Sequence, residues 1–367
     1  MPTFKRVLAG LSSAVLLGSM GLTSGAALSS ADPRPVPNLP GQPLMVDTDI
    51  TFDSDGHTFH GTYRGPADPS IAPAASALLL PGSGPIDRNG ASGPEYRAET
   101  IARLADALGS RGIATLRFDK YGTGSTGTDG PPEQAMTEYG FEQQVDDASS
   151  ALAELKKLSG TEPQHTSILG HSEGSLTALA VSERRPDAVG GLGLLQPLAM
   201  RYLDLIRAQV HAYVGRTVAA GEMEQAEGDA VLSSLEEAID SMRTKGVVPD
   251  ELHPLLPQVG ISPATARFFS EADKYDPREL AAAVPESSHT LLSCSDKDLN
   301  VNCEQVEGLR AALDHTDLEF VHMTTSNHGL GELGPVPPTQ LDSVAPLPLA
   351  FEFVGPLNAW ADGVLEP

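Results

Sequence analysis

The most constraining feature of the sequence is an apolar run, a glycine-flanked turn and a helix-forming run that follow one another over residues 166–181. The turn, Gly170-His171-Ser172-Glu173-Gly174, has the pattern Gly-x-Ser-x-Gly. Side chains at the two glycines would clash where a strand and a helix pack closely, and such a turn exposes its serine hydroxyl above the end of a sheet. The pattern therefore predicts Ser172 as a nucleophile at the carboxyl end of a buried strand.

Strand and helix patterns alternate on both sides of this turn. Short unbroken apolar runs are typical of strands buried on both faces of a parallel sheet. Apolar residues repeat at helical spacing between them, for example over residues 101–108 and 141–155. This alternation predicts an α/β fold with a mostly parallel central sheet flanked by helices. The runs interpreted as strands lie at residues 76–80, 113–118, 166–169, 189–195, 290–292 and 318–323, after a hairpin at 46–52 and 58–63.

The alternation stops over residues 199–275, where only helical patterns occur. A segment of this length is too long for a connection between a strand and a helix. We therefore predict an inserted helical cap at 199–275 and a core formed by residues 46–198 and 276–367. The alternative is that these helices lie on the core without covering a site.

The first residues have the pattern of a signal peptide. Lys5 and Arg6 precede an uncharged apolar run at residues 7–22, and small residues follow. We expect residues 1–31 to be a signal peptide, residues 32–45 to be a Pro-rich linker, and the protein to be secreted or extracytoplasmic. An uncleaved N-terminus that anchors the chain in a membrane is the alternative.

Charge and composition exclude several classes of partner. The chain has 24 Lys and Arg against 49 Asp and Glu, a net charge of −25, which disfavours binding to nucleic acid or anionic lipid. Gly122-Thr123-Gly124 lacks the third glycine of a dinucleotide-binding motif, and His57 and His60 have no nearby acid or cysteine to complete a metal site. We expect no metal, no cofactor and no stable membrane association, and the sequence does not indicate the oligomeric state.

A nucleophilic serine needs a base, and in enzymes with this turn an acid and then a histidine follow the serine along the chain. His315, His322 and His328 are the candidates that lie far enough along. His315 ends a predicted helix and His322 lies within a predicted strand, whereas His328 lies in a loop after the last strand. We therefore predict His328 as the base.

The acid is expected directly after the preceding strand, where Asp296 and Asp298 both qualify; Asp298 is preferred and Asp296 remains open. Cys294 and Cys303 are the only cysteines and flank these acids. Export would permit a disulfide that holds the acid loop, the alternative being two buried thiols.

Two backbone N–H groups are needed to stabilise an oxyanion. We predict Glu173 as one donor, because it follows the nucleophile, and Ser83 as the other, with Gly82 as the alternative. Glycines in the loop of Ser83 let its backbone approach a substrate closely. Arg117 and Asp119 are expected to brace the loop beside this site.

The segments "LLLPGSGPIDRNG", "RFDKYGTGSTG", "GHSEGS", "SDKDLNV" and "NHGL" resemble, in order, blocks of the α/β-hydrolase superfamily, in its dienelactone-hydrolase and serine-aminopeptidase-like branch. With the hairpin, the resemblance spans residues 46–365. The chain departs from it at Pro81, where many relatives carry histidine, and at Ser295, where they carry glycine.

The resemblance implies an α/β-hydrolase fold and hydrolysis of esters or amides without a cofactor. We expect a serine esterase that cleaves small-molecule carboxylic esters through Ser172, His328, Asp298 and an acyl-enzyme intermediate. The alternatives are an exopeptidase or amidase, a thioesterase, or a non-catalytic binding protein that retains the fold.

Overall fold

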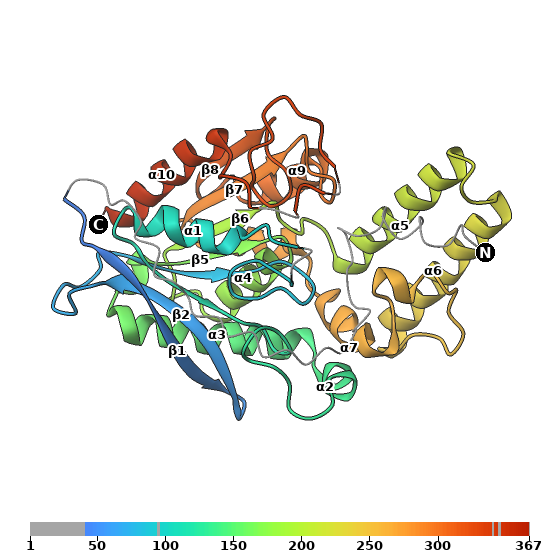
Figure 1. Ribbon diagram of the computed structural model, residues 1–367, viewed down its shortest axis with the longest axis horizontal. Coiled ribbons are helices and arrows are strands. Elements are labelled where there is room, and N and C mark those ends of the chain that lie inside the picture. Colours follow the sequence, from blue (N-terminus) through green and yellow to red (C-terminus); the bar gives the residue numbers. More distant parts are fainter. Residues whose placement is uncertain (1–40, 94–95, 340, 344–345, 367) are drawn as a thin grey trace.

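A single sheet of eight strands runs through the centre of the molecule, in the order β1-β2-β4-β3-β5-β6-β7-β8 (Figure 1). The computed structural model describes residues 41–93, 96–339, 341–343 and 346–366, so the predicted signal peptide and most of the linker lie outside the described residues. The strands are β1 (Met45–Ser54), β2 (His57–Pro66), β3 (Ser76–Leu80), β4 (Ala114–Phe118), β5 (Thr166–His171), β6 (Gly191–Leu195), β7 (His289–Ser295) and β8 (Asp317–Met323).

The predicted hairpin forms the antiparallel edge of this sheet. β1 and β2 pair antiparallel, with Phe52 opposite Phe59, and β2 also pairs antiparallel with β4. From β4 to β8 in the sheet order, each strand is parallel to the next. The prediction of a mostly parallel sheet flanked by helices is confirmed.

Helices cover both faces of the sheet, which explains why its central strands are buried throughout. In β3, Ala77 and Leu79 belong to the core under α1 (Thr100–Gly109) and α10 (Phe351–Leu365). The alternate residues, Leu78 and Leu80, pack in the opposite core. The helices on that face are α3 (Phe141–Ser159), α4 (Glu173–Arg184), α8 (Pro277–Ala282) and α9 (Cys303–Ala312).

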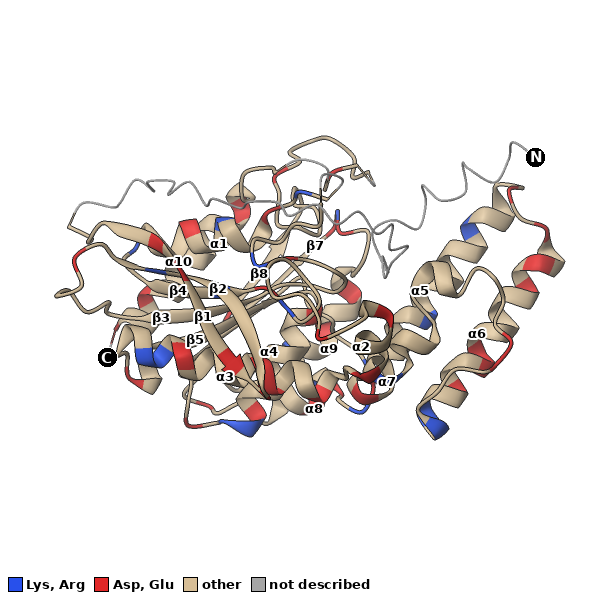
Figure 2. Cartoon of the chain, turned by 60° about the horizontal axis from the view of Figure 1, so that its bottom comes forward, with Lys and Arg blue, Asp and Glu red and all other residues tan. Residues whose placement is uncertain are grey.

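Residues 199–275 contain helices and no strand, and α5 (Tyr202–Ala219) and α6 (Gln225–Lys245) form a pair that projects from the end of the sheet (Figure 1). α7 (Pro263–Ala272) lies between this pair and the core and packs against α2 (Pro132–Glu138), a helix that the sequence pattern did not predict. The acidic side chains of α6 are exposed, and Figure 2 marks acidic residues along this helix. That this segment covers a site remains a prediction.

Among the described residues, no helix is both long enough and apolar enough to cross a bilayer.

Candidate functional site

The predicted site residues lie on loops that leave the carboxyl ends of neighbouring parallel strands. β3 and β5 are adjacent, yet the chain continues from β3 to β4 on one side and from β5 to β6 on the other. Such a change of direction opens a crevice above the strand ends, which is where α/β sheets bind ligands. Leu80 of β3 pairs with Gly170 of β5, so the loop after β3 lies directly beside the serine turn.

Ser172 occupies a strained turn between β5 and α4. Its φ of 54° and ψ of −119° lie outside the regions that a residue with a side chain ordinarily adopts. The two flanking glycines are required by sterics: a Cβ on Gly170 would lie 2.1 Å from the Gly174 carbonyl oxygen, and a Cβ on Gly174 would lie 2.5 Å from that of Leu80. The backbone therefore holds the Ser172 side chain at the junction of strand and helix.

His328 and Asp298 are brought together from loops after β8 and β7. The Nδ1 atom of His328 lies 2.7 Å from Oδ2 of Asp298. The other carboxylate oxygen, Oδ1, accepts the N–H groups of Asn300 and Val301 at 2.7 and 3.0 Å. These bonds fix the carboxylate, whose side chain is fully buried, while 15% of the His328 side chain remains exposed.

Asp296 is directed elsewhere. It pairs with Nε2 of His322 at 2.6 Å, and both side chains are about half exposed. The two aspartates that the sequence left open thus have separate histidine partners, and only Asp298 contacts His328. His315, the third candidate base, instead contacts the Val284 carbonyl oxygen through Nε2.

A disulfide joins Cys294 at the end of β7 to Cys303 at the start of α9. The loop between these cysteines contains Asp298. The two sulfur atoms and a His322 nitrogen lie within 4.8 Å of one another. Sulfur atoms joined in a disulfide carry no thiolate charge, so this group does not offer the ligand set of a zinc site.

His171 and Ser295 connect the loop of His328 to the rest of the site. His171 contacts the His328 carbonyl oxygen through Nε2 at 2.8 Å, and the two rings are 4.8 Å apart. Burial, and then the nearby charge of His328, lower the pKa of His171 from 6.5 to about 3. His171 is therefore neutral and donates its Nε2–H to that carbonyl. The Ser295 hydroxyl donates to the Ser326 carbonyl at 2.5 Å, a bond that a glycine at this position would lack.

The loop after β3 approaches the serine turn closely. A Cβ on Gly82 would lie 3.2 Å from the Cβ of Ser172, so the contact leaves little room for a side chain. The Ser83 N–H follows directly, and the Glu173 N–H is the first of α4. Among the described residues, neither N–H donates a backbone hydrogen bond, as expected for groups that await an acceptor.

A buried charged group that was not predicted from the sequence lies beneath this turn. The carboxylate of Glu173, a residue that is 3% exposed, accepts hydrogen bonds from Gln144 at 3.1 Å and from the Tyr202 hydroxyl at 2.6 Å. The ammonium of Lys120 lies 3.5 Å from the same carboxylate and donates to the Gly82 carbonyl at 2.6 Å. The signal was available, because a charged residue within a buried turn requires a partner of opposite charge.

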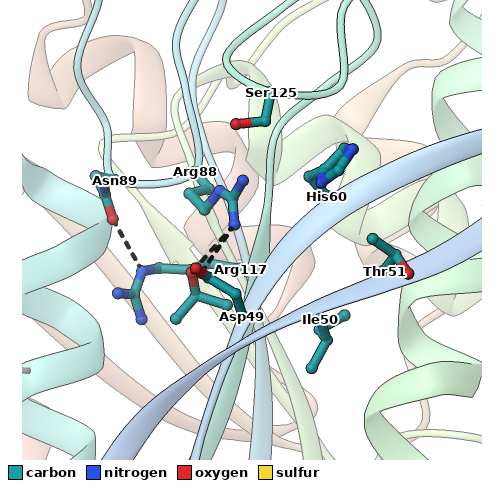
Figure 3. Close-up of a pocket in the computed structure, with 9 residues that line it drawn as sticks. Asp49, Ile50, Thr51, His60, Arg88, Asn89, Arg117 and Ser125 are labelled. Atoms are coloured by element: carbon teal, nitrogen blue, oxygen red, sulfur yellow. Dashed lines mark hydrogen bonds and ion pairs between the residues drawn. The ribbon is translucent and has the colours of Figure 1, made fainter. Parts of the chain in front are cut away.

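A pocket of about 250 Å³ lies beside β1 and β2 (Figure 3). Arg88 contacts Asp49 there, and Arg117 donates to Asn89. Arg88 also connects this pocket to the candidate site, because its backbone N–H and its Nη2 both donate to Asp119, which precedes Lys120. The pocket thus lies against the residues that brace the loop of Lys120.

Comparisons with known proteins agree with this arrangement. The sequence family described as "Serine aminopeptidase, S33" (Hydrolase_4) matches residues 91–329. Est1E from Butyrivibrio proteoclasticus, solved with ferulic acid bound, is similar in structure, with a TM-score of 0.52 at 19% identity over 76% of this chain and 91% of that one. A putative hydrolase from Agrobacterium vitis S4 gives a TM-score of 0.50 at 18% identity, over 79% and 94% of the two chains. The comparison with curated proteins gave no match. These similarities confirm the predicted α/β-hydrolase fold.

Proposed function

Because the chain belongs to the serine aminopeptidase S33 family of α/β-hydrolases, we propose that it is a serine esterase that cleaves small-molecule carboxylic esters. The observation that carries the proposal is the bond of 2.7 Å between His328 and Asp298, in loops that converge on the strained turn of Ser172. A buried carboxylate that holds one nitrogen of an imidazole leaves the other nitrogen free to accept a serine proton. A non-catalytic binding protein would have no need of this arrangement.

The proposed reaction proceeds in two steps. His328 accepts the proton of the Ser172 hydroxyl as its oxygen attacks the ester carbonyl, and the N–H groups of Glu173 and Ser83 stabilise the resulting oxyanion. The tetrahedral intermediate expels the alcohol, which takes the proton from His328, and leaves an acyl-enzyme. Water then attacks the acyl group with His328 as base, releasing the carboxylic acid and restoring Ser172.

The preference for carboxylic esters is supported by the molecule that a structural neighbour binds. Among structural neighbours, Est1E holds ferulic acid, a carboxylic acid of the kind that ester hydrolysis releases. The description of the family favours a second candidate, an aminopeptidase, whose substrate amino group would need an acidic partner near the acyl site. A thioesterase uses the same chemistry on a different leaving group.

The proposed location is outside the cytoplasm. The basic and apolar pattern of residues 1–31 supports export, and the Cys294–Cys303 disulfide suits an oxidising compartment. Purification of the protein from culture medium or periplasm, with an N-terminus determined by sequencing, tests this proposal. A protein that remains with the membrane fraction contradicts it in favour of an uncleaved anchor.

The decisive experiment labels the purified protein with a fluorophosphonate probe and measures turnover of p-nitrophenyl esters of increasing chain length. Ser172→Ala should abolish both, whereas Ser233→Ala, an exposed serine on α6, should change neither. A labelled protein that turns over aminoacyl anilides but not simple esters would be a peptidase rather than an esterase. A labelled protein that turns over acyl thioesters but not simple esters would be a thioesterase. An unlabelled and inactive wild-type protein would contradict a hydrolase altogether.

A further inference from the structure

We propose that Lys120 is a positioning residue that sets the direction of the Ser83 N–H through the Gly82 carbonyl group. The inference rests on the proposed function, because it concerns the oxyanion site of that reaction. Lys120 follows β4 by two residues, its side chain is 9% exposed, and it lies outside the predicted triad. Its ammonium donates to the Gly82 carbonyl oxygen at 2.6 Å.

The planar peptide bond between Gly82 and Ser83 links the Lys120 contact to the Ser83 N–H. The Gly82 carbonyl and the Ser83 N–H belong to one planar unit, and in a trans peptide they point in opposite directions. None of the described peptide bonds is cis. A donor that holds the carbonyl oxygen on one side therefore holds the N–H on the other side. Lys120 thus fixes the N–H that we assign to the oxyanion, without touching the substrate.

The charge of Lys120 adds a second effect. A cation at the oxygen end of a peptide polarises the unit and strengthens the N–H as a donor, since hydrogen bonds in series reinforce one another. A lone Glu173 carboxylate near the serine would instead oppose the negative charge that forms on the substrate. The Lys120 ammonium, 3.5 Å from that carboxylate, offsets its field.

Three elements hold the pair in place. Gln144 of α3 and Tyr202, the first residue of α5, both donate to Glu173. Burial, and then the charge of Glu173, raise the pKa of Tyr202 well above 10, so its hydroxyl keeps its proton and remains a donor.

The backbone beside Lys120 is held in turn by Asp119, which accepts from Arg88 and from the Ser125 N–H. Because α5 is the first helix of residues 199–275, the oxyanion loop is tied to that segment as well as to the core.

A simpler account is that Lys120 only neutralises Glu173. Lys120→Met alone cannot separate the two accounts, because it leaves a buried carboxylate without its partner and destabilises the fold. The double variant Lys120→Met/Glu173→Gln removes both charges and keeps an amide that can bond with Tyr202. Lys157→Met, which removes a lysine paired with Glu154 on the surface of α3, is the matched control.

The experiment measures the melting temperature, the kcat and KM for a p-nitrophenyl ester, and the rate of fluorophosphonate labelling. We expect the double variant to regain most of the stability that Lys120→Met loses, while its kcat stays about 10- to 100-fold below wild type and its KM changes little. Labelling should slow in parallel, and Lys157→Met should match wild type. A double variant with the kcat of wild type would overturn the proposal and leave Lys120 with a structural role.

A further variant keeps the test decisive if the methionine side chain prevents folding. Lys120→Leu/Glu173→Gln is also uncharged, and leucine has no N–H to donate to the Gly82 carbonyl. We expect a lowered kcat with an unchanged KM, and wild-type kcat would again overturn the proposal. If the wild-type protein itself neither labels nor hydrolyses esters, the proposed function fails, which is distinct from an active wild type with an equally active double variant.

Discussion

Asp298 holds His328 through a bond of 2.7 Å between Oδ2 and Nδ1, while its second oxygen accepts two backbone N–H groups from its own loop. The carboxylate is therefore fixed from both sides before any substrate arrives. Asp296, two residues earlier, contacts a different histidine and is half exposed. This difference separates two aspartates that look alike in sequence.

Asp298→Asn should lower kcat by about 10³- to 10⁴-fold, because an amide cannot stabilise the imidazolium that forms on His328. Asp296→Asn is the matched control and should leave kcat within about 2-fold of wild type, since surface pairs contribute little. Both are measured in the ester assay, with circular dichroism to show that each variant is folded. The assignment would be reversed if Asp296→Asn were the inactive variant.

Opening the Cys294–Cys303 disulfide should lower both stability and activity. The bond closes a short loop, with a sequence separation of 9 residues, and its loss should cost roughly 2–3 kcal/mol on the chain-entropy model. The same loop carries Asp298, so its release should also loosen the support of His328. Melting temperature and kcat are measured for Cys294→Ser/Cys303→Ser and for wild type with and without reductant. Reductant should have no effect on the double variant, and an unchanged kcat in wild type after full reduction would show that the acid loop keeps its shape unaided.

The protein should become less stable as the pH falls, because His171 is buried as a neutral imidazole. Its pKa is lowered from 6.5 to about 3 in the folded protein, so between these values the unfolded chain binds the proton and the folded one does not. The stability that neutral His171 contributes is complete above pH 6.5 and is lost as the pH falls toward 3. His171→Gln removes this titration, so urea unfolding curves of the two proteins should diverge from neutral pH downward. Parallel pH profiles for wild type and variant would refute the assignment.

Gly170→Ala should destabilise the protein strongly. The new Cβ would lie 2.1 Å from the backbone oxygen of Gly174, and a backbone atom in a packed turn cannot move aside cheaply. We expect a loss of about 3 kcal/mol in the free energy of unfolding, together with loss of activity. Gly215→Ala on α5 is the control, because its Cβ meets nothing within 4 Å and alanine is the better helix former. Equal stability of the two variants would show that the turn relaxes.

Much of the fold could be predicted from the sequence, because the patterns that specify it are local. β3, buried on both faces, reads as an unbroken apolar run, and α1 and α3 lie where apolar residues repeat at helical spacing over 101–108 and 141–155. α2 was missed because its polar sequence shows little helical periodicity. Ala135 is the single buried residue of this helix.

The candidate site was also predicted only in part. The turn around Ser172 is specified by consecutive residues, but the choice between Asp296 and Asp298 depends on which carboxylate reaches a loop that is distant in sequence. The buried pair of Lys120 and Glu173 was missed for that reason too. The buried turn indicates that Glu173 needs a cation, but Lys120 looks like an ordinary surface charge, and only the sheet brings the two to 3.5 Å.

The order of the strands also governs when the protein can act. His171 and His328 are 157 residues apart in the chain, and the loop of His328 follows β8, the last strand in sequence and the edge of the sheet. A chain still being synthesised can form the turn of Ser172 long before it possesses its base. Contacts so distant in sequence form late in folding. Hydrolytic activity should therefore appear only in finished chains, and its recovery during refolding should report the docking of the final strand rather than the collapse of the core.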